Sequence, residues 1–311
     1  MTNSKKGICL VIIATIFWGM MGISSRSLSM AGLNTFDISF FRCFVAGALY
    51  LLWILKKDIS ILKLDLKGIL ICSLYGIITF ALGFISYNMS VERIPISIAI
   101  VLMFTNPIWV TLFGAVLFKE KITKKKVVVI ILCIIGCLCI GDVFATGGLN
   151  LDMIGVVAGL INGITFALQI VIPKVFEDKY QKDSMLVYGF IGAAVFLAFF
   201  ADFNNIFTVI TTSSNAGNVV LNILSISVLS TFIANTFYVK STNFISTSTT
   251  SILVALEPIV ASIFAFIVFG ETLNFIQIIG AVIIVVAAMA LELDLEKCIH
   301  DIRVRLSKEV G

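Results

Sequence analysis

Charged side chains are scarce in this chain, and their scarcity limits where it can fold. Only 13% of the 311 residues are Asp, Glu, Lys or Arg, whereas soluble domains carry about 25%. With 59% hydrophobic residues and a mean hydropathy of +1.11, the chain cannot cover its surface with polar groups. The composition therefore excludes an ordinary soluble protein and predicts an integral membrane protein.

Residue types that carry catalysis are also few. The sole histidine, His300, is close to the C-terminal end, and the seven cysteines mostly lie in apolar runs without disulfide-type spacing. Cys133 and Cys137 share a helical face, but no histidine or carboxylate accompanies them, so we expect no metal. The chain has no glycine-rich GxxxxGK loop. We therefore expect no cofactor, no ATP-driven pump and no nucleic-acid partner. The sequence does not indicate an oligomeric state.

Long apolar runs recur along nearly the whole chain. Each run is long enough to be considered a membrane-spanning helix, which needs about 20 apolar residues, although the run at 126–141 is short. The first run is read as a span rather than a signal peptide, because no small-residue cleavage site follows it. The ten expected spans are 7–28, 37–55, 67–88, 95–118, 126–141, 153–173, 184–201, 218–239, 244–269 and 275–293.

The distribution of Lys and Arg predicts the orientation of these spans, because positively charged loops stay in the cytoplasm. With the N-terminus inside, eighteen Lys and Arg residues fall in cytoplasmic segments. Only Arg26, Arg93 and Lys240 are assigned to the outside, and Arg42 falls within a span. This bias predicts that both ends of the chain are cytoplasmic.

An internal duplication divides the chain into two halves. A shift of 151 residues aligns identical residues of the two halves without a gap. Each half contains five expected spans, an odd number, so the second copy must enter the membrane from the opposite side. Such inverted repeats are a physical basis for alternating access. The aligned pairs include Tyr87 with Tyr238, Ser90 with Ser241, Pro107 with Pro258, Phe113 with Phe264, and Glu120 with Glu271.

Several short motifs occur in the two halves. They are Phe17-Trp18-Gly19, Phe41-Arg42, Asn106-Pro107, Phe118 to Thr123, Leu256-Glu257-Pro258-Ile259, Phe269 to Leu273, and Gly280-Ala281. Together these motifs resemble the EamA repeat of the drug/metabolite transporter superfamily, except that Lys119 stands where the pattern has glycine. The resemblance implies a ten-helix carrier with a central cavity that moves amino acids, other metabolites or drugs.

Glu257 is the sharpest candidate for a functional residue. A carboxylate within a span is unfavourable in hydrocarbon unless it faces a cavity or a partner. Pro258 frees a backbone carbonyl one turn back, so Glu257 is either a substrate contact or proton carrier, or a structural group beside the helix break. Thr249 and Thr250 share its helical face. Asn106 occupies the equivalent position in the first half, again before proline, with the same two interpretations open.

Other polar and aromatic residues share faces of expected spans. Asn162, Phe166 and Gln169 recur at helical spacing in the sixth span, where they either line a substrate path or form interhelical hydrogen bonds. Asn235 and Tyr238 share a face of the eighth span.

Four aromatic or charged residues have both a functional and an ordinary interpretation. Trp18 is either a wall for a planar or cationic substrate or a packing residue. Tyr238 and Tyr87 are expected near the outer interface, where an aromatic belt is the ordinary explanation. Arg42 is expected to extend to the lipid headgroups rather than bind an anion.

These observations predict an all-α polytopic membrane protein of ten transmembrane helices, arranged as two inverted five-helix repeats around a central cavity. The repeats are assigned to 7–141 and 153–293, and a cytoplasmic tail to 294–311. We expect a secondary transporter of the cell membrane that moves an amino acid or an organic amine, with the solute and the lipid bilayer as its partners. A membrane-embedded enzyme or a channel is the alternative. The expected substrate-binding residues are Trp18, Asn106, Asn162, Phe166, Gln169, Asn235, Tyr238 and Glu257, with Glu257 also the candidate for proton coupling.

The charge distribution generates a topology prediction. Reporter tags fused to either end of the chain should be cytoplasmic, and Asn215→Cys should react with an impermeant maleimide added outside intact cells. A tag at either terminus that is labelled from outside would rule out the ten-span arrangement.

Overall fold

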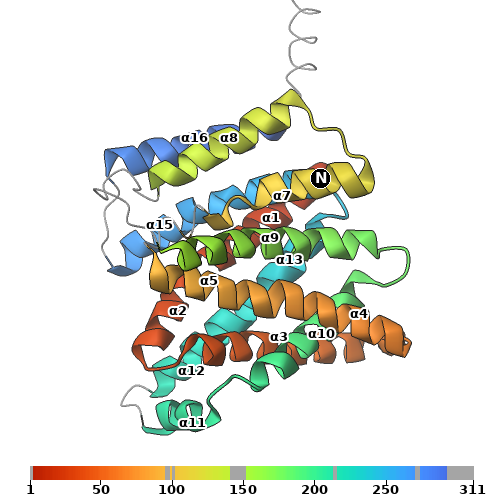
Figure 1. Ribbon diagram of the computed structural model, residues 1–311, viewed down its shortest axis with the longest axis vertical. Coiled ribbons are helices and arrows are strands. Elements are labelled where there is room, and N and C mark those ends of the chain that lie inside the picture. Colours follow the sequence, from red (N-terminus) through yellow and green to blue (C-terminus); the bar gives the residue numbers. More distant parts are fainter. Residues whose placement is uncertain are drawn as a thin grey trace, which may run out of the picture.

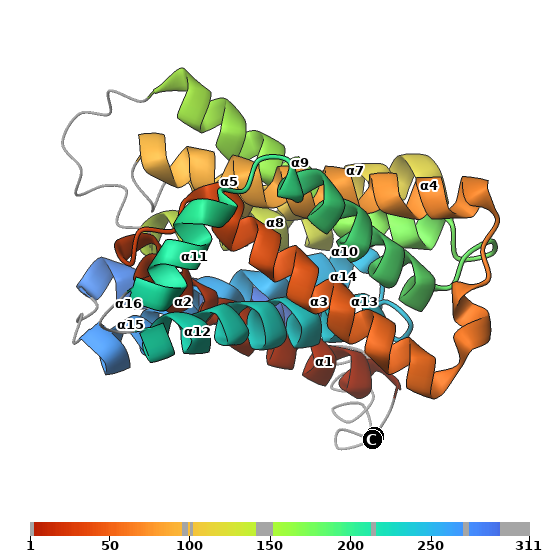
Figure 2. The same cartoon turned by 90° about the horizontal axis from the view of Figure 1, so that it is seen from below.

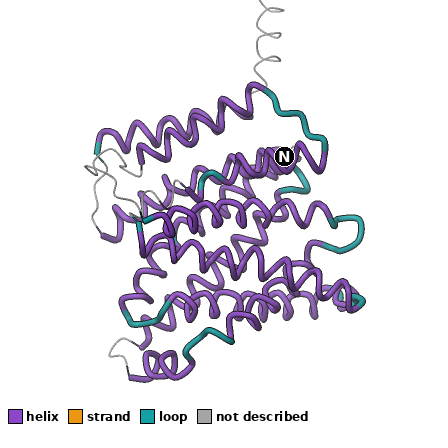
Figure 3. The backbone as a smooth tube through the Cα atoms, in the orientation of Figure 1, coloured by secondary structure: helices purple, strands orange, loops and turns teal. Residues whose placement is uncertain are grey.

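The computed structural model describes residues 3–94, 99, 102–140, 152–212, 216–269 and 274–292. Within these ranges every regular element is a helix and there is no strand (Figure 3). The expected tail at 294–311, the labelling position Asn215 and His300 lie outside the described residues.

The helices of the first half follow the first three expected spans and the fifth to within a few residues. In the fourth, 95–118, helix α7 begins only at Asn106, and residues 95–98, 100 and 101 lie outside the described residues. The first expected span is divided at Met20, and the third contains a π-helical segment, η2, in its middle. These elements are α1 (Asn3–Gly19), α2 (Met21–Met30), α3 (Thr35–Lys57), η1 (Ile59–Leu62), α4 (Leu66–Gly76), η2 (Ile77–Ala81), α5 (Leu82–Arg93), α7 (Asn106–Phe118) and α8 (Lys124–Ile140).

The second half repeats this pattern. The eighth expected span of the chain contains a π-helical segment, η3, and the ninth is divided by the short 3₁₀ segment η4. The elements are α9 (Met153–Val175), α10 (Lys182–Ala198), α11 (Phe203–Thr212), α12 (Ala216–Leu224), η3 (Ser225–Ile233), α13 (Ala234–Ser241), α14 (Thr247–Leu253), η4 (Val254–Leu256), α15 (Glu257–Phe269) and α16 (Phe275–Glu292).

Five described helices are long and apolar enough to cross a membrane. A sixth candidate is the pair formed by α10 and α11, which bends by 96° (Figure 2). Shorter apolar helices occur at Asn106–Phe118 and Phe275–Ala287. The protein is thus an all-helical, multi-pass membrane protein, while the count of ten spans stays a prediction. The five candidates are Ser4–Met30, Thr35–Lys57, Leu66–Ser90, Met153–Val175 and Ala216–Ser241.

Large apolar side chains cover the outer faces of the bundle. Leu70 and Leu74 on α4 are exposed at one-turn spacing, as are Val282 and Val286 on α16. Contiguous exposed apolar surface of this kind is unfavourable in water and favourable in lipid. These faces therefore contact the hydrocarbon.

The helices lie side by side as a stack, with α8 and α16 at one edge and α3 and α10 towards the other (Figure 1). Most helices of one half pack on helices of the other. Helix α1 packs on α13 and α15, and in the same manner α9 packs on α5 and α7. Helix α3 packs on η3, and α10 packs on η2. The contacts are thus reproduced when the two halves are exchanged.

Lys240 lies at the same end of the bundle as the N-terminal segment and the end of α3. The ammonium groups of Lys57 and Lys240 both lie over the Trp53 ring, 4.8 and 4.3 Å from its centroid. Lys6 and Lys240 also line the same surface cavity. The assignment of Lys240 to the outside is therefore wrong, because α13 returns the chain to the N-terminal end. The correction strengthens the charge bias between the two ends.

The backbone conformation at Lys119 explains why the EamA pattern has glycine at this position. Its φ of 55° lies in the left-handed region, at the position that ends α7. Glycine is favoured at such a position because it has no Cβ to clash with the backbone. The lysine is exposed, so its side chain adds no packing contact that would offset this strain.

Two glycines allow α4 and α10 to touch. A Cβ built on Gly76 would lie only 1.7 Å from the carbonyl oxygen of Gly189. No real Cβ contact is that short, and the neighbouring atom is backbone rather than a flexible side chain. The close approach of α4 and α10 therefore requires glycine at position 76.

Gly76→Ala should lower the free energy of unfolding by about 1–3 kcal/mol, the range typical of overpacking, because the added methyl group forces the two backbones apart. Thermal unfolding of the purified protein in detergent measures the effect. Gly217→Ala is the matched control, because a Cβ at Gly217 has no neighbour within 4 Å. Equal melting temperatures for the two variants would contradict the close packing of α4 on α10.

Candidate functional site

A polar cavity lies inside the bundle, between the two halves. Its volume is about 60 Å³, enough for a few water molecules or a small polar group in this conformation. The first half contributes Trp18, Met21, Arg42, Thr79, Gly83, Phe84, Tyr87 and Met103 to its wall. The second half contributes Asn162, Thr165, Phe166, Gln169, Asn235 and Glu257.

Glu257 projects into this cavity from a helix break. Helix α15 begins at Glu257, directly after the 3₁₀ segment η4, and Pro258 follows in its first turn. The N-terminal end of a helix carries partial positive charge, which favours a carboxylate there. Glu257 is only 8% exposed. None of the hydrogen bonds or ion pairs among the described residues involves its carboxylate.

Arg42 brings a buried positive charge to the same cavity. Its side chain extends from α3, and the residue is 5% exposed. Nε donates a hydrogen bond to Oγ1 of Thr231 at 3.2 Å, and the guanidinium lies 3.6 Å from the centroid of the Phe84 ring. The expectation that Arg42 extends to the headgroups is wrong, because α3 turns this side chain towards the interior.

The three predicted amides line the cavity and also bond to neighbouring helices. Asn162 Nδ2 donates to the carbonyl oxygen of Gly83 on α5 at 2.8 Å. Gln169 Nε2 donates to Oδ1 of Asn235, whose Nδ2 donates to the Thr231 carbonyl at 2.8 Å. Asn162 Oδ1 has no hydrogen-bond partner among the described residues. These amides therefore both line the cavity and form hydrogen bonds between helices, so the two interpretations given for them are compatible.

Aromatic rings form the wall around Trp18. The Trp18 ring packs edge-on against Phe166 at 5.3 Å and against Tyr238 at 4.9 Å, measured between centroids. Tyr238 is fully buried behind the cavity wall, and Tyr87 belongs to the wall itself. The interpretation of Tyr238 and Tyr87 as an outer aromatic belt is therefore wrong.

Some expected residues lie apart from the cavity. Asn106 is fully buried at the start of α7 and is not part of the cavity wall. Thr249 and Thr250 also lie outside the wall and bond near the start of α14, where Ser246 accepts from the Thr249 backbone N–H. Arg42 was the functional candidate that sequence reasoning placed wrongly. An arginine within an apolar run was the signal available for it.

No cluster of three or more His, Cys, Asp or Glu side chains that could hold a metal ion occurs in the described part of the chain. The cysteines at 133 and 137 are both buried and free.

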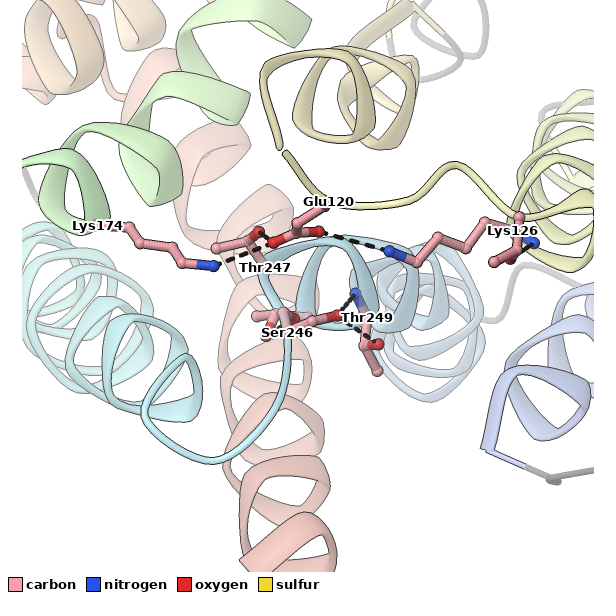
Figure 4. Close-up of polar contacts among 8 residues, drawn as sticks. Glu120, Lys126, Lys174, Ser246, Thr247 and Thr249 are labelled. Carbon is pink, nitrogen blue, oxygen red and sulfur yellow. Dashed lines mark hydrogen bonds and ion pairs between the residues drawn. The ribbon is translucent and has the colours of Figure 1, made fainter. Parts of the chain in front are cut away.

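A polar cluster joins the two halves at the end of the bundle where α7, α9 and α14 meet (Figure 4). The Glu120 carboxylate lies 3.0 Å from Lys174 Nζ and 3.5 Å from Lys126 Nζ. Thr247 Oγ1 donates to the same carboxylate at 3.2 Å. Partial burial raises the pKa of Glu120, but the hydrogen bonds and charges of its partners outweigh it, so the pKa lies below its ordinary value.

An all-helical bundle with apolar outer faces and a charged, polar cavity between two similar halves is typical of membrane carriers. The model of the EamA-like transporter family matches residues 5–141 and 153–292. The chain belongs to this family and is a multi-pass protein of the cell membrane.

Similar proteins carry transporter names. An uncharacterized transporter of Clostridium kluyveri is 26% identical over 92% of both chains. The uncharacterized transporter YxxF of Bacillus subtilis is 24% identical, over 94% of this chain and 90% of its own. A solved crystal structure superposes with a TM-score of 0.75 over 92% of this chain and 96% of that chain, at 13% identity. At that identity the superposition shows a shared fold alone.

The cluster around Glu120 generates a pH prediction. Because its pKa is lowered in the folded protein, the stabilisation is present above the ordinary pKa of a glutamate and is lost as the pH falls through the lowered value. Wild type should therefore melt at a higher temperature than Glu120→Gln at neutral pH, and the difference should disappear in acid.

Thermal unfolding of both proteins between about pH 3 and pH 8 measures this, a range that brackets the ordinary glutamate pKa. Lys174→Gln is the matched variant, and it should lower the melting temperature at neutral pH as Glu120→Gln does. A difference between wild type and Glu120→Gln that stays constant into acid would contradict the role of the Glu120 charge.

Proposed function

We propose that this protein is a secondary carrier that moves an amino acid or an organic amine across the cell membrane by alternating access. The observation that carries the proposal is the buried Glu257 carboxylate, which faces the central cavity and makes no hydrogen bond or ion pair among the described residues. A carboxylate is stable in such a place when a cation or a proton compensates its charge. A substrate amine or a transported proton supplies that compensation.

The two halves supply the symmetry that alternating access needs. Residues 7–141 and 153–293 are proposed as two inverted repeats of five spans, and the tail at 294–311 and both termini as cytoplasmic. The exchangeable packing of the helices supports this arrangement. So do the π-helical segments, because Ile77–Ala81, shifted by the 151-residue repeat, falls within Ser225–Ile233. π-Helical segments are frequent at functional sites.

The ionic cluster supports a closed state at one end of the cavity. Glu120 belongs to the first half, whereas Lys174 and Thr247 belong to the second. Opening the bundle at this end would have to break those contacts. In the alternating-access scheme, the cluster around Glu120 is thus the cytoplasmic gate.

Counterflow in liposomes tests the proposal. Protein reconstituted with an unlabelled amino acid or amine inside should accumulate the labelled compound from outside, and the initial rate should saturate. Liposomes with the same lipid and no protein are the control. Flux that grows linearly with concentration and shows no counterflow would indicate a channel instead.

Glu257→Gln should lower transport at least about tenfold while the protein remains folded, because it keeps the shape of the side chain and removes its charge. A loss of substrate affinity at every pH assigns Glu257 to the substrate amine. A loss of pH-driven accumulation with exchange retained assigns it to the proton. Glu177→Gln, at an exposed position, is the matched control. Unchanged affinity together with unchanged pH dependence would contradict both roles.

A further inference from the structure

Two opposite charges line one buried cavity without pairing. Arg42 and Glu257 are both in its wall, and both are more than nine-tenths buried. Neither residue has an oppositely charged N or O atom within 4.0 Å of its own charged group among the described residues. Opposite charges that share a low-dielectric cavity attract each other, but because these two are not in contact, the hydrogen-bonding groups of each remain available to a ligand.

The contacts of Arg42 hold it by one edge and leave the rest of the guanidinium available. Nε is bonded to Thr231, and one face of the group lies on Phe84. None of the described hydrogen bonds involves the two terminal nitrogens of Arg42. Neither nitrogen is among the fully enclosed polar atoms that lack a partner, so the cavity remains accessible to them. Their planar fork matches the geometry of a carboxylate.

The two buried charges restrict the chemical class of the substrate. A simple amine would compensate Glu257 and leave Arg42 uncompensated, whereas a simple carboxylate would do the reverse. Each such ligand would leave one buried charge unsatisfied, which is strongly unfavourable. A ligand with one ammonium and one carboxylate group compensates both Arg42 and Glu257 and leaves no buried charge unsatisfied.

We infer that Arg42 binds the carboxylate and Glu257 the ammonium group of a zwitterionic amino acid, so that the site selects amino acids over amines and simple acids. This inference rests on the proposed carrier function and narrows its substrate class. The cavity of about 60 Å³ suits the compact polar head of such a molecule. Trp18 and Phe166, in the same wall, provide apolar surface for its side chain.

The test compares matched ligands that differ by one charged group. The probes are L-phenylalanine, phenethylamine and 3-phenylpropionate, together with L-alanine, ethylamine and propionate. Binding is measured by the thermal shift of the full-length purified protein, and transport by counterflow in liposomes. Wild type should bind at least one of the amino acids at least about tenfold more tightly than its two single-charge analogues.

Variants should shift this preference in opposite directions. Arg42→Gln should lose at least about tenfold in affinity for the amino acid and should bind the amine nearly as well as wild type does. Glu257→Gln should lose affinity for the amino acid and should retain its affinity for the simple carboxylate. Arg93→Gln is the matched control, because Arg93 is an exposed arginine that pairs with Asp152 outside the cavity. Arg42→Lys retains the positive charge and should retain part of the preference.

Three results would overturn the inference. Wild type that takes the amine as readily as the amino acid would show that no carboxylate is recognised, and saturable counterflow of that amine would leave the carrier proposal standing. A folded Arg42→Gln protein with the wild-type preference would exclude Arg42 as the carboxylate site. If none of the six probes binds or exchanges, the inference and the proposed substrate class both fail. The comparison of ligands on the wild-type protein tests the selectivity for amino acids even if Arg42→Gln does not fold.

Discussion

Hydrocarbon offers no hydrogen bonds, and this constraint determines where each polar group of the chain lies. Backbone groups in lipid must be satisfied within the protein, which leaves the helix as the stable element here. The division of the ninth expected span at Glu257 occurs beside the cavity, and the irregular backbone before it lies within the protein, where Val254 and Ala255 are buried. Arg42 faces the same interior space. The polar interior is therefore a result of the lipid environment as much as of the substrate.

Hydrogen bonds connect the cavity residues into one network. Gln169 on α9 bonds to Asn235 on α13, and Asn235 bonds to the Thr231 carbonyl in η3. The hydroxyl of the same threonine accepts from Arg42 on α3. Because these bonds link helices of both halves, a change in any one of them alters the position of the others. The residues that hold the helices together are thus also the residues that shape the site.

The sequence predicted the pattern along the chain better than the direction in which side chains point. Apolar runs and the 151-residue repeat anticipate the helices of both halves, because burial in lipid imposes long apolar segments. A carboxylate deep within a span was expected to face a cavity or a partner, and Glu257 does line the cavity, while its role in binding stays a prediction. Arg42 was placed wrongly, since depth along a helix does not say which way the helix is rotated. Tyr238 was assigned to the wrong end, as was Lys240, which follows it by two residues.

Gly76 and Gly189 bring the backbones of α4 and α10 together, and α4 belongs to the first half while α10 belongs to the second. No side chain lies between the two backbones there, so no rotamer change can absorb a sliding motion. The glycine contact therefore sets the distance between the two halves at this point, where the backbones themselves meet.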